Sequence, residues 1–280
     1  MANTIIEKRT LGQGIVELTV DAPRIAGKAQ PGQFVVVRLH ERGERIPLTL
    51  ADWDPPRGTI TVVVQMAGKT TRELGEGFHV GDTIRDVAGP LGSPSEVHRY
   101  GTVVCVGGGV GIAPIYPIAR GLREEGNEVI GIVGARTSGL LFWLDRMRDV
   151  FHELHVATDD GSRGVKGVVT IPLQEVLSKR KVDHVWAIGP AIMMKFCTKT
   201  CQESGVPITV SLNPIMIDGT GMCGGCRVEV SGKARFACVD GPEFPGDLVN
   251  WDLLLARLGT FRDEEQCALE RYLSVKGGAR

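Results

Sequence analysis

The residues best suited to carry chemistry are three cysteines and one aspartate near the C-terminal end of the chain. Cys223 and Cys226 are separated by two residues, Cys238 follows twelve positions after Cys226, and Asp218 lies five positions before Cys223. A plant-type 2Fe–2S loop has the spacing Cys-x4-Cys-x2-Cys with a distant fourth cysteine. Asp218 occupies the first position of that pattern. Because a carboxylate can also ligate iron, the sequence predicts a 2Fe–2S site held by three thiolates and Asp218.

Two other interpretations of these cysteines stay open. A structural zinc site would use the same three thiols and one more ligand, but such sites usually add a second close pair of ligands, which this sequence lacks. The three cysteines could also be free thiols. The remaining cysteines are interpreted as core or surface thiols rather than ligands: Cys105, Cys197, Cys201 and Cys267.

A glycine-rich sequence at residues 103–114, Val-Val-Cys-Val-Gly-Gly-Gly-Val-Gly-Ile-Ala-Pro, is the second chemical signal. A strand that runs through glycines into a helix leaves backbone amides at the helix N-terminus, where they can bind phosphate. The pattern departs from the Rossmann fingerprint, because Ile112 stands at the third glycine position and Gly134-Ala135-Arg136 ends the next strand without an acid. We expect a nucleotide site unlike that of a standard dehydrogenase; a plain strand-to-helix turn is the alternative.

Two segments in the first third of the chain are weaker candidates for a binding site. Residues 45–49, Arg-Ile-Pro-Leu-Thr, end in a predicted strand, and residues 68–74 are a predicted turn into a helix. Thr70 and Glu73 have the spacing of a capping box. Taken alone, the second segment is therefore interpreted as an ordinary helix cap.

Composition limits the class of protein. The chain has 280 residues, of which 42% are apolar and 23% charged, with a formal net charge of −1. This balance disfavours a disordered chain and a protein that mainly binds nucleic acid or an anionic membrane. No signal peptide is predicted, so a cytoplasmic location is expected. The uncharged residues 100–119 are rich in glycine and proline and are interpreted as strand, turn and helix rather than a membrane span.

The order of the expected elements predicts the fold class. Val-, Ile- and Thr-rich runs separated by turn residues predict an antiparallel six-stranded barrel, with strands at residues 4–8, 14–20, 34–39, 48–51, 59–66 and 83–87. From about residue 100, strands alternate with helices, which predicts a parallel sheet covered on both faces. One helix is expected to follow the glycines and to end near residue 125. Further helices are expected at 140–150, 171–179 and 191–204. Strands are expected at 102–106, 128–133, 153–158, 184–188 and 208–212, the last of which closes the series. A compact Cys- and Gly-rich segment and a charged, helical tail follow.

Taken in order, these features resemble the ferredoxin–NADP reductase superfamily. The features are a barrel, a Gly-Gly-Gly-x-Gly-x-x-Pro turn, the later Ile188-Gly189-Pro190-x-x-Met193 and the ferredoxin-like loop. Within the superfamily, the chain is similar to the electron-transfer subunit of dihydroorotate dehydrogenase. It is more similar to the small subunit of bifurcating NADH-dependent ferredoxin:NADP oxidoreductase, because Asp218 replaces the first cysteine.

The resemblance implies four parts: an FAD-binding barrel at 1–97, an NAD(P)-binding α/β domain at 98–212, a 2Fe–2S segment at 213–250 and a helical tail at 251–280. The FAD contacts implied are Arg45, Pro47, Leu48, Thr49, Gly68, Thr70 and Thr71. The nicotinamide nucleotide contacts implied are Gly108, Gly109, Val110, Gly111, Pro114, Arg136, Asp159, Asp160, Gly189 and Pro190. Two positions depart from the family pattern: its arginine would fall at Ile46, one place after Arg45, and Ile188 replaces a frequent cysteine.

The implied function is electron relay: NAD(H) would give a hydride to FAD, and single electrons would pass through the 2Fe–2S cluster to a larger iron–sulfur flavoprotein subunit. No acid–base or nucleophilic pair stands out, so no catalytic side chain is predicted. Arg136 favours NADP, whereas the resemblance favours NAD. A dihydroorotate dehydrogenase subunit and a redox-sensing regulator are the alternatives. Candidate contacts with the larger subunit are Met216, Ile217, Met222 and residues 251–255.

Overall fold

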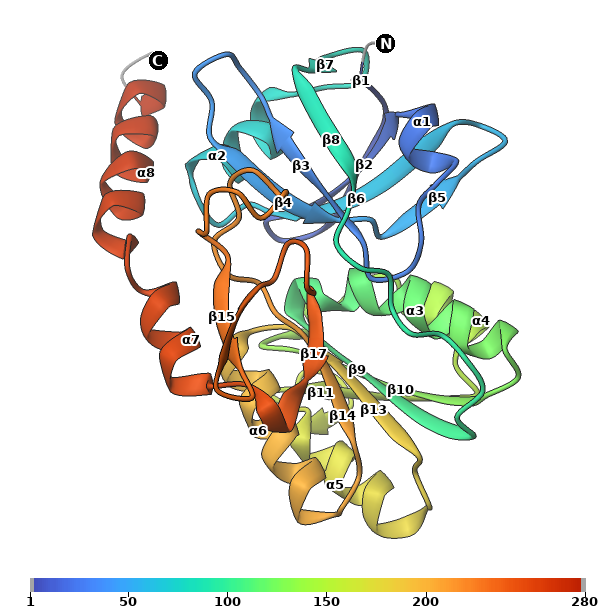
Figure 1. Ribbon diagram of the computed structural model, residues 1–280. Helices are drawn as coiled ribbons and strands as arrows, with labels where there is room; N and C mark the ends of the chain where they lie inside the picture. Colours follow the sequence, from blue (N-terminus) through green and yellow to red (C-terminus); the bar gives the residue numbers. More distant parts are fainter. Residues whose placement is uncertain (1–2, 278–280) are drawn as a thin grey trace.

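The computed structural model describes residues 3–277, and its N-terminal part is a β region of two sheets (Figure 1). One sheet has the order β5-β6-β2-β1-β7 and the other β4-β3-β8. The strands are β1 (Asn3–Gly12), β2 (Ile15–Asp21), β3 (Phe34–Arg38), β4 (Arg45–Thr49), β5 (Asp52–Asp54), β6 (Thr59–Gln65), β7 (Thr83–Ile84) and β8 (Asp86–Leu91). Short helical turns α1 (Pro23–Ala26), α2 (Lys69–Arg72) and η1 (Glu73–Gly77) connect them. Apolar side chains from both sheets, including Leu18, Val35 and Leu50, fill the space between the sheets.

The structure has eight strands here where six were predicted, because the chain changes sheets within two of the predicted strands. The Leu50 amide bonds to Gln33 O beside β3, and the next amide, of Ala51, bonds to Thr61 O in β6. The predicted strand 48–51 therefore covers the end of β4 and the two residues that lead into β5. The strand predicted at 83–87 is divided in the same way, since Ile84 pairs with Asn3 and Asp86 pairs with Arg38.

The middle of the chain forms a seven-stranded sheet of order β12-β11-β10-β9-β13-β14-β17. Its elements are β9 (Thr102–Gly108), η2 (Gly109–Gly111), α3 (Ile112–Glu124), β10 (Glu128–Ala135), η3 (Ser138–Leu140), α4 (Leu144–Val150), β11 (Glu153–Thr158), β12 (Val165–Lys166), α5 (Thr170–Lys179), β13 (His184–Ile188), α6 (Ala191–Glu203) and β14 (Ile208–Ser211). These six strands are parallel, and β17 (Glu243–Pro245) is antiparallel to β14.

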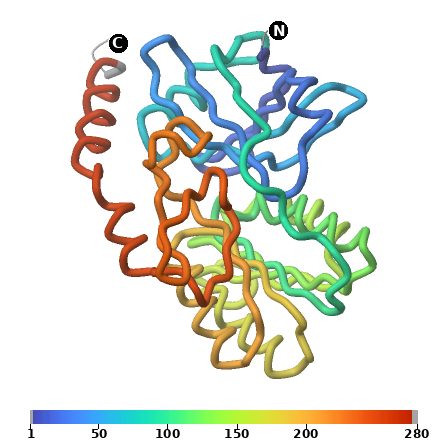
Figure 2. Tube along the Cα trace, in the orientation of Figure 1, coloured from blue at the N-terminus to red at the C-terminus, as the bar shows by residue number. Residues whose placement is uncertain are grey.

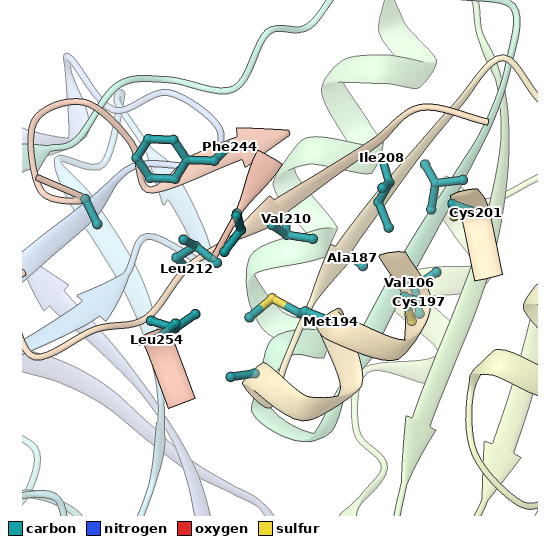
Figure 3. Close-up of a cluster of buried hydrophobic side chains, with 14 of the residues drawn as sticks. Val106, Ala187, Met194, Cys197, Cys201, Ile208, Val210, Leu212, Phe244 and Leu254 are labelled. Atoms are coloured by element: carbon teal, nitrogen blue, oxygen red, sulfur yellow. The ribbon is translucent and has the colours of Figure 1, made fainter. Parts of the chain in front are cut away.

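Alternation along β9 builds a core on both faces of this sheet. Val103 and Cys105 face α3 and α4, whereas Val104 and Val106 face α5 and α6. All four side chains are fully buried, as expected for a central parallel strand. Figure 3 shows Val106 with Met194, Cys197 and Val210 in the second of these cores.

One prediction for this region was wrong, and one strand was missed. The helix predicted at 140–150 begins only at Leu144, because Leu140 ends a 3-10 turn and Trp143 is left-handed, with φ 56°. The strand predicted at 208–212 is β14, which ends the alternating series, and β17 then pairs with β14 and covers its outer edge, a pairing that the sequence did not predict.

The last part of the chain packs against both of the preceding regions. β15 (Arg227–Val230) and β16 (Lys233–Phe236) form a hairpin, and η4 (Gly246–Leu248), α7 (Trp251–Leu258) and α8 (Arg262–Gly277) follow. α7 lies against α6 and β15, and α8 passes beside α2 of the N-terminal β region (Figure 2). Within the described residues, no helix is long and apolar enough to span a membrane.

Candidate functional site

A cavity of about 850 Å³ lies between the N-terminal β region and the carboxyl ends of the parallel strands. In the sheet order, β10 lies on one side of β9 and β13 on the other. Successive strands are therefore added first to one side of β9 and then to the other, so the strand order reverses at β9. Ligands in open α/β sheets bind at this kind of switch point. The predicted residues that line the cavity are Pro47, Thr49, Gly108, Gly109, Val110, Gly111, Pro114, Arg136, Asp159, Gly189 and Pro190.

The glycine turn, residues 107–111, is shaped by close backbone approach. A Cβ at Gly111 would lie 2.2 Å from Ile188 O, and a Cβ at Gly108 would lie 2.2 Å from Met193 Sδ. Gly109 is left-handed, with φ +56°, and apart from its two chain neighbours no described residue has a heavy atom within 4 Å of a Cβ built there. No side chain in the described part of the chain caps the N-terminus of α3 at Gly111. The turn therefore presents bare backbone to the cavity, as binding of a phosphate requires.

Arg136 and Asp159 lie beside each other at the ends of two paired strands. The Asp159 amide donates to Ala135 O at 3.2 Å, and the Asp160 amide donates to Arg136 O at 3.2 Å. Asp159 lines the cavity, whereas the Asp160 carboxylate accepts from the amide and hydroxyl of Ser162. The Ser162 hydroxyl is the main cause that holds the pKa of Asp160 below its usual value. The acid that the Rossmann pattern expects at the end of the second strand is absent from β10. Asp159, which directly follows β11, supplies a carboxylate beside that position instead.

The predicted FAD contacts divide between the cavity and other surroundings. Pro47 and Thr49 line the cavity, whereas Leu48, between them, packs into the core of the N-terminal β region. Arg45 is exposed at the start of β4. The remaining predicted FAD contacts, Gly68, Thr70 and Thr71, lie outside the cavity lining at the start of α2.

The side chains around α2 are paired differently from the predicted capping box. The Gly68 amide donates to Thr71 Oγ1 at 3.0 Å, so Thr71 has the capping role expected of Glu73. Glu73 instead contacts His40 Nε2 at 2.8 Å. The Thr70 hydroxyl donates to the Glu44 carboxylate. Predicting the cap from Thr70 and Glu73 was therefore wrong, because Gly68 rather than Thr70 precedes the first helical residue.

The cysteine loop, residues 218–226, is organised around the Asp218 carboxylate. Asp218 accepts from the amides of Thr220 at 2.8 Å and Cys223 at 2.7 Å, and the Thr220 amide is the main cause that lowers the pKa of Asp218. The sulfurs of Cys226 and Cys238 are 3.2 Å apart and buried, whereas Cys223 is exposed. Burial is the largest cause that raises the pKa of Cys238 to about 12.

The loop brings the predicted ligands together in pairs rather than as a closed set. Among the described residues, no group of three or more His, Cys, Asp or Glu side chains is close enough to hold a metal ion. Three thiols and a carboxylate are nevertheless the donor set that an iron–sulfur centre needs, and their deprotonation would accompany metal binding. The donors present therefore fit a 2Fe–2S centre. Of the other cysteines, Cys105, Cys197 and Cys201 are buried in the core, and Cys267 is exposed on α8.

Sequence reasoning missed the apolar rim of the cavity. Val168, Ile192 and Phe196 line it with roughly half of each side chain exposed. Ile192 and Phe196 are four residues apart on α6, so they form one apolar strip on the outer face of a helix. That strip could have been found in the sequence, because exposed helix faces are usually polar.

A second missed feature fixes the cavity's two walls. Asp52 of β5 pairs with Arg120 of α3 at 2.9 Å and also with Arg146 of α4. The Arg146 guanidinium lies 4.3 Å from the Trp143 ring centroid, and the Trp143 indole donates to Glu17 of β2 at 2.7 Å. These contacts hold the N-terminal β region against the helices that follow β9 and β10.

The sequence comparisons agree with this arrangement. Residues 213–250 match the family model of the iron–sulfur cluster binding domain of dihydroorotate dehydrogenase B. The chain is 54% identical to a dihydroorotate dehydrogenase B (NAD(+)) electron transfer subunit homolog of Thermotoga maritima, covering 98% of this chain and 97% of that protein. It is 34% identical to the dihydroorotate dehydrogenase B electron transfer subunit of Bacillus caldolyticus, over 86% of this chain and 95% of that one.

Solved structures show the same relationship. A chain from the NADH-dependent reduced ferredoxin-NADP oxidoreductase, studied for flavin-based electron bifurcation, is 53% identical with a TM-score of 0.92 and 98% coverage of both chains. Phthalate dioxygenase reductase, 18% identical with a TM-score of 0.59, shares the fold over 82% of this chain and 86% of that one. The chain has the fold of the ferredoxin reductases, and it belongs to the family of dihydroorotate dehydrogenase B electron transfer subunits.

Proposed function

We propose that this chain is the NADH-oxidising subunit of an NADH-dependent ferredoxin:NADP oxidoreductase, and that it relays electrons to a larger iron–sulfur flavoprotein subunit. One observation carries the choice within the family: the 53% identity to the oxidoreductase chain extends over 98% of both chains. Asp218 at the first position of the cysteine loop supports the same choice. A dihydroorotate dehydrogenase complex is the second candidate, favoured by the family model that matches residues 213–250.

The proposal assigns a two-electron and a one-electron centre to this chain. FAD accepts a hydride and releases electrons singly, and a 2Fe–2S cluster carries one electron at a time. The protein's own task is therefore to bind, to orient and to exclude water. The cavity between the two regions is apolar for most of its lining, which suits exclusion of water from a reduced flavin.

The nicotinamide nucleotide is proposed to lie across the glycine turn. Amides at the start of α3 would bind its pyrophosphate, and Gly189 and Pro190 at the end of β13 would border the nicotinamide. Arg136 and Asp159 would lie at the adenosine end. The Asp159 carboxylate would repel a 2′-phosphate, so we propose NADH rather than NADPH as the donor.

FAD is proposed to lie along β4. Ile46 and Leu48 face the interior of the N-terminal β region, whereas Arg45, Pro47 and Thr49 alternate onto the opposite side of the strand. Pro47 and Thr49 would border the flavin ring, and Arg45 would reach its phosphates. The start of α2, with Gly68, Thr70 and Thr71, would hold the pyrophosphate.

The ligands proposed for the 2Fe–2S cluster are Asp218, Cys223, Cys226 and Cys238. The domain limits proposed are 1–97, 98–212, 213–250 and 251–280, and the location proposed is the cytoplasm. Ile217, just before the cysteine loop, and Met222 within it are exposed, at 47% and 88%, so they are proposed to contact the larger subunit.

The test is reconstitution of the purified chain under anaerobic conditions. We expect bound FAD, iron with acid-labile sulfide, and a paramagnetic signal from the reduced cluster. The chain alone should reduce an artificial dye with NADH, and it should reduce ferredoxin or NADP only after the larger subunit is added. Zinc in place of iron would refute the cluster assignment, and full NADP reduction by the isolated chain would refute its role as a subunit.

A second experiment separates the two candidate complexes. The larger protein that co-purifies from native cells should be assayed with NADP and with dihydroorotate. Reduction of NADP by NADH together with reduced ferredoxin supports the proposal, whereas NAD-dependent turnover of dihydroorotate supports the alternative.

A further inference from the structure

The carboxyl group of Glu243 lies where three parts of the molecule meet. Glu243 belongs to β17, which lies within the cysteine segment, residues 213–250, and pairs with β14. Its Oε1 accepts from the Ser95 hydroxyl at 2.6 Å, and its Oε2 accepts from the Trp186 indole of β13 at 3.4 Å. A Cβ at Gly32 would lie 3.0 Å from Oε1, so the turn before β3 also packs on this group. None of the proposed cofactor contacts involves Glu243.

Backbone bonds around Glu243 attach the cysteine segment to the linker, residues 92–101, which joins the N-terminal β region to β9. The Ser93 amide donates to Gly241 O at 2.7 Å, and the Ser93 hydroxyl donates to Val239 O at 3.2 Å. On the other side, the Leu212 amide donates to Pro242 O at 2.9 Å. Residues 239–243 begin directly after Cys238, so these contacts connect a proposed cluster ligand to the linker.

The surroundings of Glu243 favour a neutral carboxyl. Burial is the main cause that raises the pKa of Glu243 to about 7, and the nearby carboxylate of Glu96 acts in the same direction. Tyr100 of the linker and Cys105 of β9 also face Glu243, and burial raises the pKa of each. His184, two residues before Trp186 on β13, is neutral at pH 7, because burial lowers its pKa to about 4. The hydrogen bonds to Ser95 and Trp186 oppose the shift, but neither partner carries a positive charge.

We propose that Glu243 is a positioning residue for electron transfer, which in its protonated form holds the cysteine segment against the linker and so fixes the cluster relative to the flavin. This inference rests on the proposed function, because it assumes that the cysteine segment carries the cluster. A neutral carboxyl can stay enclosed between Ser95, Trp186 and the Gly32 turn. An ionised one without a cationic partner draws water into that contact and loosens it.

The test compares Glu243→Gln, which stays neutral at every pH, with Glu125→Gln. Glu125 is exposed at the end of α3 and makes none of the contacts described for Glu243, so its substitution is the control for the loss of one negative charge. Hydrogen exchange of the Ser93 and Leu212 amides is followed at about pH 6 and about pH 8.5, on either side of the expected titration, and corrected for intrinsic exchange rates. Both amides report on the bonds to residues 239–243 directly.

We expect protection of these two amides in the native protein to fall about tenfold or more between the two pH values. Glu243→Gln should keep its protection at both, and Glu125→Gln should behave as the native protein does. Equal pH dependence in Glu243→Gln, or none in the native protein, would overturn the inference. Should Glu243→Gln fail to fold, Ser95→Ala is the substitute, since it removes one partner of the carboxyl and should lower protection already at pH 6. Unchanged protection in that variant would also count against the inference.

A second measurement follows electron transfer in the loaded protein. In stopped-flow reduction by NADH, the ratio of cluster reduction rate to flavin reduction rate should fall above pH 7 in the native protein and stay level in Glu243→Gln. If the rate of cluster reduction and the rate of flavin reduction changed with pH in the same proportion, Glu243 would have a purely structural role, and the positioning role would be refuted. Iron analysis of the same samples tests the proposed function separately, because a protein without iron would still give a decisive exchange result.

Discussion

The glycine turn and the cysteine loop are both rich in glycine, but their glycines serve different physical needs. In the glycine turn, Gly108 and Gly111 have ordinary backbone angles; the backbone of Ile188 lies where a Cβ of Gly111 would stand, and the flexible Met193 side chain lies where a Cβ of Gly108 would stand. In the cysteine loop, Gly219, Gly221 and Gly224 have φ between +68° and +83°. The first site is shaped by packing between β9, β13 and α3, whereas the second is shaped by its own backbone conformation. Substitutions should therefore act through collision at one site and through local conformation and ligation at the other.

The largest effect on stability is expected from Gly111→Ala. The new Cβ would stand 2.2 Å from Ile188 O, which belongs to a central strand and cannot move aside. Overpacking of this kind costs about 3 kcal/mol. Chemical denaturation should show that loss, together with weaker binding of NADH. A loss below about 1 kcal/mol would mean that β13 yields more easily than its position in the sheet suggests.

Asp218→Ala should affect the cysteine loop without a comparable loss of global stability. The variant removes the acceptor for the Thr220 and Cys223 amides together with a proposed iron ligand. Iron content should fall severalfold, while the midpoint of chemical unfolding of the rest of the chain should change little. Asp218→Cys is the matched variant: it should keep its iron but shift the cluster potential, because a thiolate donates more charge than a carboxylate. If Asp218→Ala keeps both spectrum and potential, Asp218 is not a ligand.

Asp159→Asn should change nucleotide preference. Asp159 lines the cavity beside Arg136, and removal of its charge should raise the ratio of kcat/KM for NADPH over NADH about tenfold, or about 1.4 kcal/mol. Dye reduction with each nucleotide measures the ratio. Asp160→Asn is the control, with a smaller shift expected because that carboxylate is turned towards Ser162. Equal shifts in the two variants would show that the combined negative charge of Asp159 and Asp160, rather than Asp159 alone, selects the nucleotide.

The smallest effect is expected from Gly109→Ala, which contrasts with Gly111→Ala two residues away. Gly109 has φ +56°, and apart from its two chain neighbours no described residue has a heavy atom within 4 Å of the point where its Cβ would stand, so only the left-handed conformation is penalised. That penalty is about 1 kcal/mol. A thermal denaturation series on both alanine variants ranks them. If Gly109→Ala were the more damaging, conformation rather than collision would dominate this turn as well.

The sequence predicted correctly those elements whose own residues show a clear apolar pattern. β13 has the limits that its apolar run predicts, and α6 ends one residue earlier than expected, at Glu203. β17 could not be predicted, because Glu-Phe-Pro is too short to show alternation and forms a strand only where β14 offers an unpaired edge. The sheet changes at Leu50 and between β7 and β8 likewise depend on partners far along the chain.

The candidate site shows the same division. The glycine turn, Arg136 and Asp159 line the cavity, because strand ends and glycines mark such positions in the sequence. Leu48 was grouped with Pro47 and Thr49, although alternation along a strand must turn it the other way. Glu243 carries no sequence signal at all, since its surroundings come from β13, the linker and the turn at Gly32.

The antiparallel pairing of β17 with β14 also bears on how this chain could be shortened. A version that ended near residue 212 would leave β14, with the buried Ile208 and Val210, as a bare outer strand. Exposed apolar edges of this kind recruit strands from other molecules and lead to aggregation. Loss of the cysteine segment would thus remove the proposed redox centre and expose an aggregation-prone edge strand at the same time. A reductase without this segment needs another way to protect the edge strand of its sheet, such as a charged residue or a proline in that strand.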